Sequence, residues 1–174
     1  EKITRRLQQK NHRTMLEIDL NALVHNLNVY RSKTTARIMV MVKAFSYGSG
    51  SQEIANALQY QRVDYLCVAY VDEGIVLRDA GIHLPILVMN PEVSGFDLMM
   101  DHDLEPEIYN FRSLFSFLAA LAKRNLVSYP VHLKLETGMN RLGFREEELD
   151  QLFEIFQQHP HVRILSVFSH LGTA

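Results

Sequence analysis

The sequence predicts an α/β fold built on a parallel sheet, and three observations support this prediction. Short apolar runs alternate with helical patterns along the whole chain. The apolar runs are almost unbroken, which is typical of strands that are buried on both faces. The chain has 174 residues, of which 47% are hydrophobic and 22% charged, as in an ordinary globular domain.

Six strands account for the apolar runs, and a shorter one is expected before them. Residues 16–19, Leu-Glu-Ile-Asp, alternate between apolar and acidic side chains like a short strand. A doubly wound open sheet can be built from six strands, whereas a (β/α)8 barrel needs eight, so the pattern alone leaves both architectures open. The six main strands are expected at residues 37–42, 65–69, 85–89, 104–109, 131–135 and 164–168.

The helices between these strands are recognised by apolar residues spaced three and four apart. Asp19 is expected to cap the first helix, and Gly81 is well placed to end the third. The helices are expected at residues 20–27, 51–60, 72–80, 96–102, 111–124 and 146–157.

Composition excludes several classes of protein. The net charge of -2 comes with no basic stripe, which argues against a nucleic-acid partner. No apolar run approaches the length of a membrane span, and residues 1–13 look like a polar leader or interdomain linker without a signal peptide. The lone Cys67 lies in an apolar run, so we expect a buried structural thiol in a reduced, cytoplasmic protein.

Polar residues follow the ends of three of these strands. Lys43 and Tyr47 follow the first strand, Arg141 the fifth and His170 the sixth. The carboxyl ends of parallel strands share one edge, so these side chains are expected to converge there. A desolvated lysine has a lowered pKa and can form a Schiff base, although Lys43 alone is equally compatible with a lysine that reaches the solvent at a barrel rim.

Two glycine-containing turns lie among these polar residues. Residues 47–50, Tyr-Gly-Ser-Gly, precede a helix, and such a turn suits a bound anion. Residues 137–141, Thr-Gly-Met-Asn-Arg, place Arg141 where it can meet a carboxylate or a phenolate. A surface arginine and a structural His170 remain alternatives at this point. The histidines show no spacing that indicates a metal site.

At these residues the chain resembles the alanine racemase family. Residues 42–50 (Val-Lys-Ala-Phe-Ser-Tyr-Gly-Ser-Gly) resemble its cofactor-lysine segment, Val-Lys-Ala-Asn-Ala-Tyr-Gly-His-Gly. Residues 131–143 contain its Thr-Gly-Met-x-Arg core, and residues 169–174 (Ser-His-Leu-Gly-Thr-Ala) are similar to its Thr-His-Phe-Ala-Thr-Ala segment. Residues 16–22 match its usual opening, so four segments occur in the order of the family.

The resemblance implies a pyridoxal-phosphate-binding TIM (β/α)8 barrel, truncated to about six strand–helix units in residues 14–174. It implies a cytoplasmic homodimer that interconverts L- and D-alanine for peptidoglycan synthesis. In the family a second base and the main phosphate loop come after the point at which this chain ends, so the chain as given is expected to be inactive. The alternatives are a non-catalytic pyridoxal-phosphate barrel for cofactor homeostasis and a structural barrel domain of a fusion protein.

The resemblance also implies roles for four cofactor-binding residues. Lys43 would form the aldimine with pyridoxal 5'-phosphate and act as the base on one face of the substrate carbon. Tyr47 would hydrogen-bond the phosphate. Arg141 would contact the phenolic oxygen of the cofactor and the substrate carboxylate, and His170 would pack against the cofactor ring.

Two further positions and two departures follow from the same resemblance. Met139 matches a position that faces the substrate from the partner subunit, and Lys134 matches a lysine that is carbamylated in some members. Phe45 and Ser49 replace the Asn and His of the family's first segment. The leader 1–13 resembles the connector of proteins in which a cell-wall peptide ligase precedes a racemase.

Overall fold

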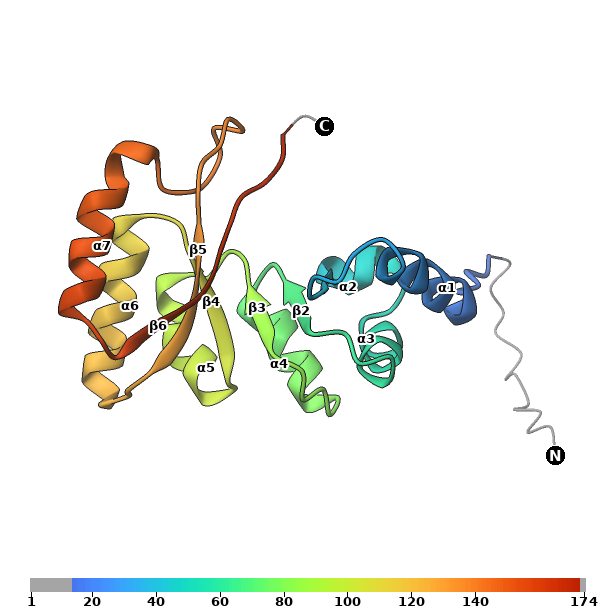
Figure 1. The fold of residues 1–174 in the computed structure, drawn as a ribbon. Coiled ribbons are helices and arrows are strands. Elements are labelled where there is room, and N and C mark those ends of the chain that lie inside the picture. Colours follow the sequence, from blue (N-terminus) through green and yellow to red (C-terminus); the bar gives the residue numbers. More distant parts are fainter. Residues whose placement is uncertain (1–13, 173–174) are drawn as a thin grey trace.

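The computed structural model describes residues 14–172, so the predicted leader at residues 1–13 lies outside the described residues. One sheet of six parallel strands forms its centre, and the strands lie in the sheet in the same order as in the chain (Figure 1). The strands are β1 (Met39–Met41), β2 (Tyr65–Val68), β3 (Ile86–Val88), β4 (Leu104–Ile108), β5 (Tyr129–Lys134) and β6 (Val162–Phe168). All six main strands that the sequence predicts are therefore confirmed.

The predicted helices are also present, and two of them have the predicted bounds. These two are α3 (Ser51–Tyr60) and α6 (Phe111–Arg124). The short segments α2 and η1 add to the predicted set, and the helix predicted at residues 146–157 is divided into η2 and α7. The remaining helical elements are α1 (Leu20–Arg31), α2 (Lys43–Gly48), α4 (Val71–Asp79), η1 (Val93–Gly95), α5 (Phe96–Asp101), η2 (Glu146–Glu148) and α7 (Leu149–Gln158).

The beginning of the described chain confirms one prediction and corrects another. The Asp19 carboxylate accepts hydrogen bonds from the backbone N–H groups of Asn21 (2.8 Å) and Ala22 (3.2 Å), so Asp19 caps α1 as expected. The strand predicted at residues 16–19 is wrong. These residues pair with no strand of the sheet, and Leu16 is 72% exposed. An alternating pattern forms a strand only where a neighbouring strand satisfies its backbone.

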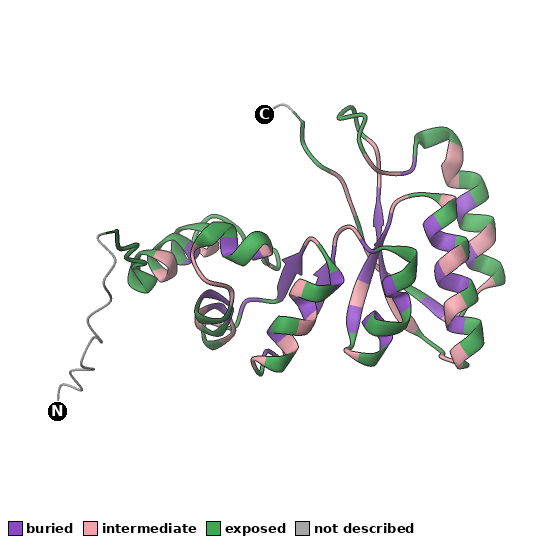
Figure 2. Cartoon of the chain, turned by 180° about the vertical axis from the view of Figure 1, so that it is seen from behind, coloured by how far each residue is buried: buried purple, intermediate pink, exposed green. Residues whose placement is uncertain are grey.

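The core lies between the sheet and the helices that cover one of its sides (Figure 2). Every residue of β2 and β3 is buried, whereas β1 and β6, at the two ends of the sheet, are only partly buried. These two strands are the open edges expected of six strands that do not close. Among residues 14–172 no helix has both the length and the apolar composition to cross a membrane.

The two faces of the sheet differ in the side chains that they carry. Leu66 and Val88 belong to the apolar cluster shared with the helices, whereas Cys67 and Leu87 are buried on the opposite face, outside that cluster. The buried position expected for Cys67 is confirmed. Burial raises the pKa of the Cys67 thiol to about 12, so the thiol stays protonated at neutral pH.

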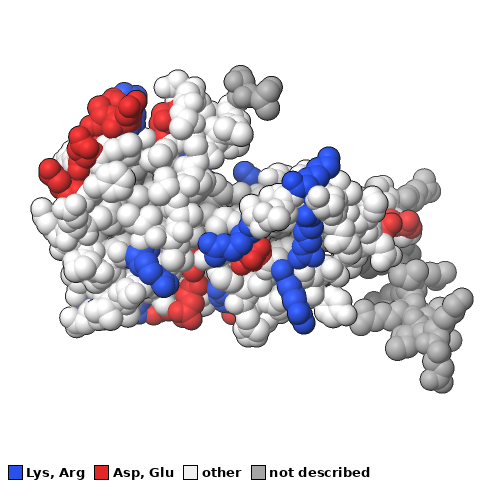
Figure 3. All heavy atoms as spheres, viewed as in Figure 1, with Lys and Arg blue, Asp and Glu red and all other residues white. Residues whose placement is uncertain are grey.

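A group of acidic side chains lies at the corner of the molecule where α7 begins (Figure 3). In Figure 3 acidic side chains crowd the upper left corner, where η2 supplies three consecutive glutamates immediately before α7. Acidic side chains at a helix start interact favourably with the helix dipole, so this cluster stabilises the beginning of α7.

Candidate active site

Lys43 stands at the carboxyl end of β1, where the chain enters a left-handed turn. Residues 44–47 all have φ between 51° and 57° and ψ between 36° and 53°. The Ser46 N–H donates to the Val42 carbonyl (3.1 Å), and the Gly50 N–H donates to the Phe45 carbonyl (2.9 Å). The sequence predicts a flexible turn only for residues 47–50, so this ordered left-handed segment directly after Lys43 is new.

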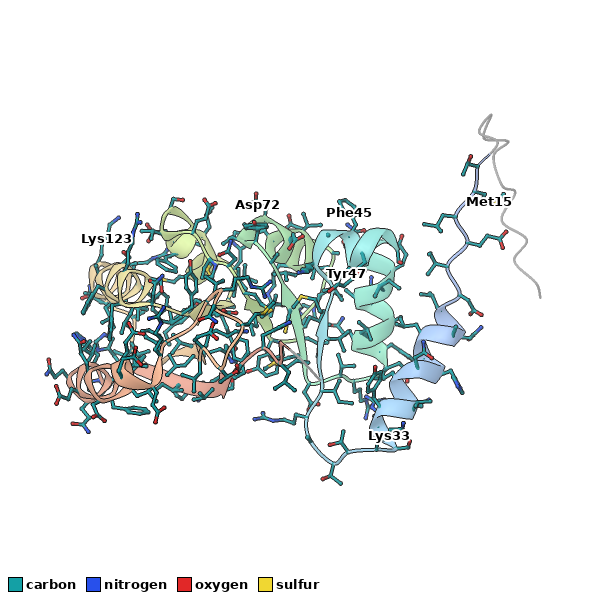
Figure 4. All side chains as sticks on the ribbon, turned by 90° about the horizontal axis from the view of Figure 1, so that it is seen from above. Met15, Lys33, Phe45, Tyr47, Asp72 and Lys123 are labelled. Atoms are coloured by element: carbon teal, nitrogen blue, oxygen red, sulfur yellow. The ribbon has the colours of Figure 1, made fainter. Side chains whose placement is uncertain are left out.

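The side chains of this turn differ in burial. Lys43 is half-buried and Ser46 is buried, whereas Phe45 and Tyr47 are exposed. Figure 4 shows Phe45 and Tyr47 on α2, close to the start of α4. The turn therefore presents a hydroxyl and an aromatic ring to the solvent beside a lysine that is partly shielded from it.

A second group of predicted residues meets beyond the ends of β5 and β6. Lys134, Met139, Arg141 and His170 line one hollow, together with Thr137 and Ser169 of the same two loops. The hydroxyls of Thr137 and Ser169 are hydrogen-bonded to each other, which joins the loops. Four of the six predicted site residues are thus brought together.

Lys43 and Tyr47 do not line this hollow. They follow β1 at one end of the sheet, whereas the hollow follows β5 and β6 at the other end (Figure 1). Because all strands are parallel, both groups lie at the same edge of the sheet, as predicted. Three strands, β2, β3 and β4, lie between the two groups in the sheet, and the convergence of the two groups on one ligand stays a prediction.

The loop that carries Arg141 is shaped by one carboxylate and one glycine. The Glu136 carboxylate accepts hydrogen bonds from the N–H groups of Gly138 and Arg141, the latter at 3.1 Å. Backbone hydrogen bonds from Asn140 and Gly138 hold the pKa of Glu136 below its usual value. Gly143 has φ +131°, and a Cβ there would lie 2.5 Å from the Glu136 nitrogen. Only glycine fits this position without moving the backbone.

A polar network on the inner face of β4, β5 and β6 was missed by the sequence analysis. His132 is fully buried; its Nδ1 lies 2.6 Å from Ser166 Oγ and its Nε2 2.6 Å from Glu105 Oε2. The ring of Tyr65 meets the His132 ring edge-on at 5.6 Å. Burial, and then the Glu105 charge, raise the pKa of Tyr65 to about 12. The signal that could have revealed the network is polar residues two apart on neighbouring strands, which share one face.

Lys134 and Glu107 are two buried ionisable groups on this same inner face. Lys134 is 5% exposed, and its Nζ lies 4.4 Å from the centroid of the Phe168 ring, within reach of a cation–π interaction. Glu107 is 1% exposed, and its Oε2 has no hydrogen-bond partner among residues 14–172. Burial raises the pKa of Glu107 to about 7, although the charges of Lys134 and Arg141 pull it down.

Glu107 should make stability depend on pH in a defined direction. Its pKa is raised on folding, so its contribution is present below about pH 4.5 and is lost as pH rises through about 7. In Glu107→Gln the free energy of unfolding should fall less between about pH 5 and about pH 8 than in the wild type, by roughly 2–3 kcal/mol. Denaturant titrations at the two pH values measure this difference. The exposed Glu154→Gln is the control, and equal pH slopes in all three proteins would contradict the expectation.

Comparison with known proteins assigns the family. The family model described as alanine racemase, N-terminal domain, matches residues 18–174. The chain belongs to this family. An alanine racemase of Sorangium cellulosum is 35% identical over 169 residues, and one of Thermodesulfovibrio yellowstonii is 38% identical over 164 residues. The alignments cover 92% and 91% of this chain but 45% and 44% of the relatives, so the chain spans less than half of their length.

A solved alanine racemase supports the same assignment of the fold. The structure of alanine racemase from Clostridium difficile in complex with cycloserine superposes with a TM-score of 0.82 at 30% identity. The match covers 88% of this chain and 43% of that one. The six parallel strands and their helices therefore match the N-terminal barrel of alanine racemases. This confirms the fold class predicted from the sequence, with the barrel not closed over these residues.

Proposed function

We propose that this chain is the pyridoxal-phosphate-binding part of an alanine racemase that interconverts L- and D-alanine. The observation that carries the proposal is Lys43, half-buried at the carboxyl end of β1 and followed by an ordered left-handed turn. The amine of a lysine placed there can attack a carbonyl to form a Schiff base. The names of the relatives, all alanine racemases in the alignments above, support the reaction.

The residues present fit pyridoxal 5'-phosphate. Lys43 offers the amine, and the exposed Tyr47 offers a hydroxyl for the phosphate. Arg141 is exposed and takes part in no salt bridge within residues 14–172, which leaves its guanidinium available to an anionic oxygen. His170 is exposed in the same hollow, where its ring can pack against a flat cofactor. When bound, the cofactor supplies an electron sink that makes the α-proton of an amino acid removable.

Residues of this chain would then have separate roles in the reaction. Lys43 would move the proton on one face of the substrate carbon. Arg141 would bind the substrate carboxylate, because a guanidinium meets a carboxylate with two parallel hydrogen bonds. Met139, which is half-exposed, would limit the space for the side chain of a substrate bound to the partner subunit. Carbamylation, in which the free amine of the buried Lys134 bonds to the carbon of CO2 and releases a proton, would place a carboxylate anion at the hollow that Arg141 also lines.

The oligomeric state of the protein, its location and the use of its product belong to the same proposal. A homodimer is part of the proposal, as the resemblance to the family implies. A cytoplasmic location agrees with a lone cysteine that is buried and not paired. D-alanine made there would serve peptidoglycan synthesis. Cycloserine is bound in the Clostridium difficile structure, so a competition experiment between cycloserine and alanine is a suitable test of substrate binding.

Borohydride trapping tests the role of Lys43. The protein is incubated with pyridoxal 5'-phosphate, reduced, digested and analysed by mass spectrometry. We expect the cofactor mass on the peptide that contains Lys43, and a loss of at least about tenfold in labelling in Lys43→Ala. Lys33→Ala, which changes an exposed lysine after α1, should label like the wild type.

Three outcomes would count against the proposal, the last of them against its racemase part alone. Labelling spread evenly over exposed lysines would mean that Lys43 has no special reactivity. Labelling that survives Lys43→Ala would place the cofactor elsewhere. Labelling at Lys43 without any exchange of the α-hydrogen of alanine with solvent would favour a cofactor-handling barrel over a racemase.

A further inference from the structure

The left-handed turn after Lys43 has a conformation that its residues would not adopt alone. A non-glycine residue in this region costs roughly 1–2 kcal/mol, and such residues normally occur singly. Here four non-glycine residues, 44–47, follow one another in it. Hydrogen bonds within the turn offset part of this cost, so contacts from outside the turn are needed to hold it.

Glu73, in the first turn of α4, makes such a contact. Its Oε1 accepts a hydrogen bond from the Ala44 N–H at 2.6 Å. Its Oε2 accepts hydrogen bonds from the N–H groups of Ala69 (2.7 Å) and Tyr70 (3.1 Å). One half-buried carboxylate therefore binds three backbone donors from two separate segments of the chain. Hydrogen bonds to an ionised acceptor are the stronger kind.

The position of these donors decides what the carboxylate does. The Ala44 N–H belongs to the peptide bond that joins Ala44 to Lys43, so fixing it fixes the direction in which the chain leaves Lys43. Ala69 directly follows β2, the strand that pairs with β1. Glu73 thus ties together the carboxyl ends of β1 and β2, at the edge of the sheet that carries the candidate site.

A purely local role does not account for this arrangement. As the third residue of α4, Glu73 caps the helix by accepting from the Tyr70 N–H. That role needs only the bond at 3.1 Å. The shorter bond to Ala44 reaches a residue 29 positions earlier in the chain and adds nothing to the cap.

We propose that Glu73 is a positioning residue for Lys43, which holds the left-handed turn so that the lysine amine faces the cofactor. This rests on the proposed function, in which Lys43 carries pyridoxal phosphate. Glu73 touches neither the cofactor nor the substrate. It acts through the backbone of Ala44, and a carboxylate is required because three N–H donors converge on it.

Glu73→Gln tests the proposal with little change in shape. The amide keeps one acceptor oxygen but turns an NH2 group toward a backbone donor, so at least one of the two tethers is lost. Asp72→Asn is the matched control: Asp72 is the neighbouring residue in the same helical turn, is exposed, and carries the same charge (Figure 4). Two readouts are recorded while circular dichroism shows every protein to be folded. They are the amide resonance of Ala44 without cofactor, and the rate at which pyridoxal phosphate becomes trapped on Lys43.

We expect the Ala44 resonance to shift in Glu73→Gln and trapping on Lys43 to slow by roughly 10- to 100-fold, with Asp72→Asn unchanged in both. Should Glu73→Gln not fold, Glu73→Asp keeps the charge at a shorter reach and should give an intermediate trapping rate. A folded Glu73 variant that is less stable but traps cofactor at the wild-type rate would overturn the proposal, because Glu73 would then be only a helix cap. If the wild type traps no cofactor on Lys43, the proposed function fails. The Ala44 resonance of Glu73→Gln then still tests by itself whether Glu73 holds the turn. A resonance unshifted from that of the wild type would overturn this role.

Discussion

Phe117→Ala should lower the free energy of unfolding by about 3–5 kcal/mol, the largest effect on stability that we expect from one side chain. Phe117 is fully buried on α6. Its ring meets Phe96 of α5 edge-on at 5.1 Å and Tyr129 of β5 at 5.6 Å. Its removal would leave a cavity between two helices and the sheet, because the surrounding rings belong to two different elements, α5 and β5, that cannot both move inward.

A urea titration of Phe117→Ala measures this effect, with Phe115→Ala as the control. Phe115 lies on the same helix but is half-exposed, and among residues 14–172 the one aromatic ring that it stacks against is Phe111. Its truncation should cost less than about 1 kcal/mol. Similar losses in the two variants would show that α6 does not contribute to the core in the way its burial indicates.

Arg78→Met should lower the free energy of unfolding by about 2–3 kcal/mol, the second largest effect on stability that we expect. The Arg78 guanidinium donates hydrogen bonds to the backbone carbonyls of His102 (2.9 Å), Ile82 (2.7 Å), Leu84 (2.8 Å) and Asp103 (2.9 Å). It thereby connects the end of α4 to the segment before β3 and to the turn between α5 and β4. Methionine keeps the length of the side chain but leaves these carbonyls without their donors.

The loss of stability in Arg78→Met should come from the lost arrangement of N–H donors, and not from the lost positive charge alone. Partial burial lowers the pKa of Arg78, but the group remains charged at neutral pH. Arg78→Lys keeps the charge but presents a single ammonium, so it should recover less than half of the loss. Arg112→Met, at an exposed position on α6, should change the denaturation midpoint little. A complete recovery with lysine would contradict the role given to the guanidinium.

Elements that a strong local pattern defines were the ones that the sequence predicted best. The bounds of α6 follow from its apolar stripe, from Asn110 accepting the Ser113 N–H at the start, and from Asn125 in the left-handed conformation at the end. The strand expected at residues 16–19 failed because a strand depends on a partner, and periodicity carries no information about partners.

The candidate site was predictable where residue types follow strand ends, and only in part elsewhere. Lys134 and Arg141 lie at one hollow as expected. The left-handed turn was not predictable, because Phe45 and Ser46 rarely adopt positive φ and do so here with a tether from Glu73, a residue distant in sequence. Glu107 escaped notice for a similar reason. Its burial depends on the neighbouring strands, and the two glutamates of β4, Glu105 and Glu107, give no sign of it in the sequence of β4 alone.

Each strand lies beside the strands that precede and follow it in the chain, so β2, β3 and β4 stand in the sheet between the strand that Lys43 follows and the strand that leads to Arg141. The contact of the Tyr65 ring on β2 with the His132 ring on β5 also joins the two halves of the sheet. Within residues 14–172 the distance from Lys43 to Arg141 is therefore set by β2, β3 and β4 and by the contacts that hold these strands together. Substitutions in these three strands touch neither Lys43 nor Arg141. They can nevertheless change how the two side chains face each other, while the local structure around each side chain stays intact.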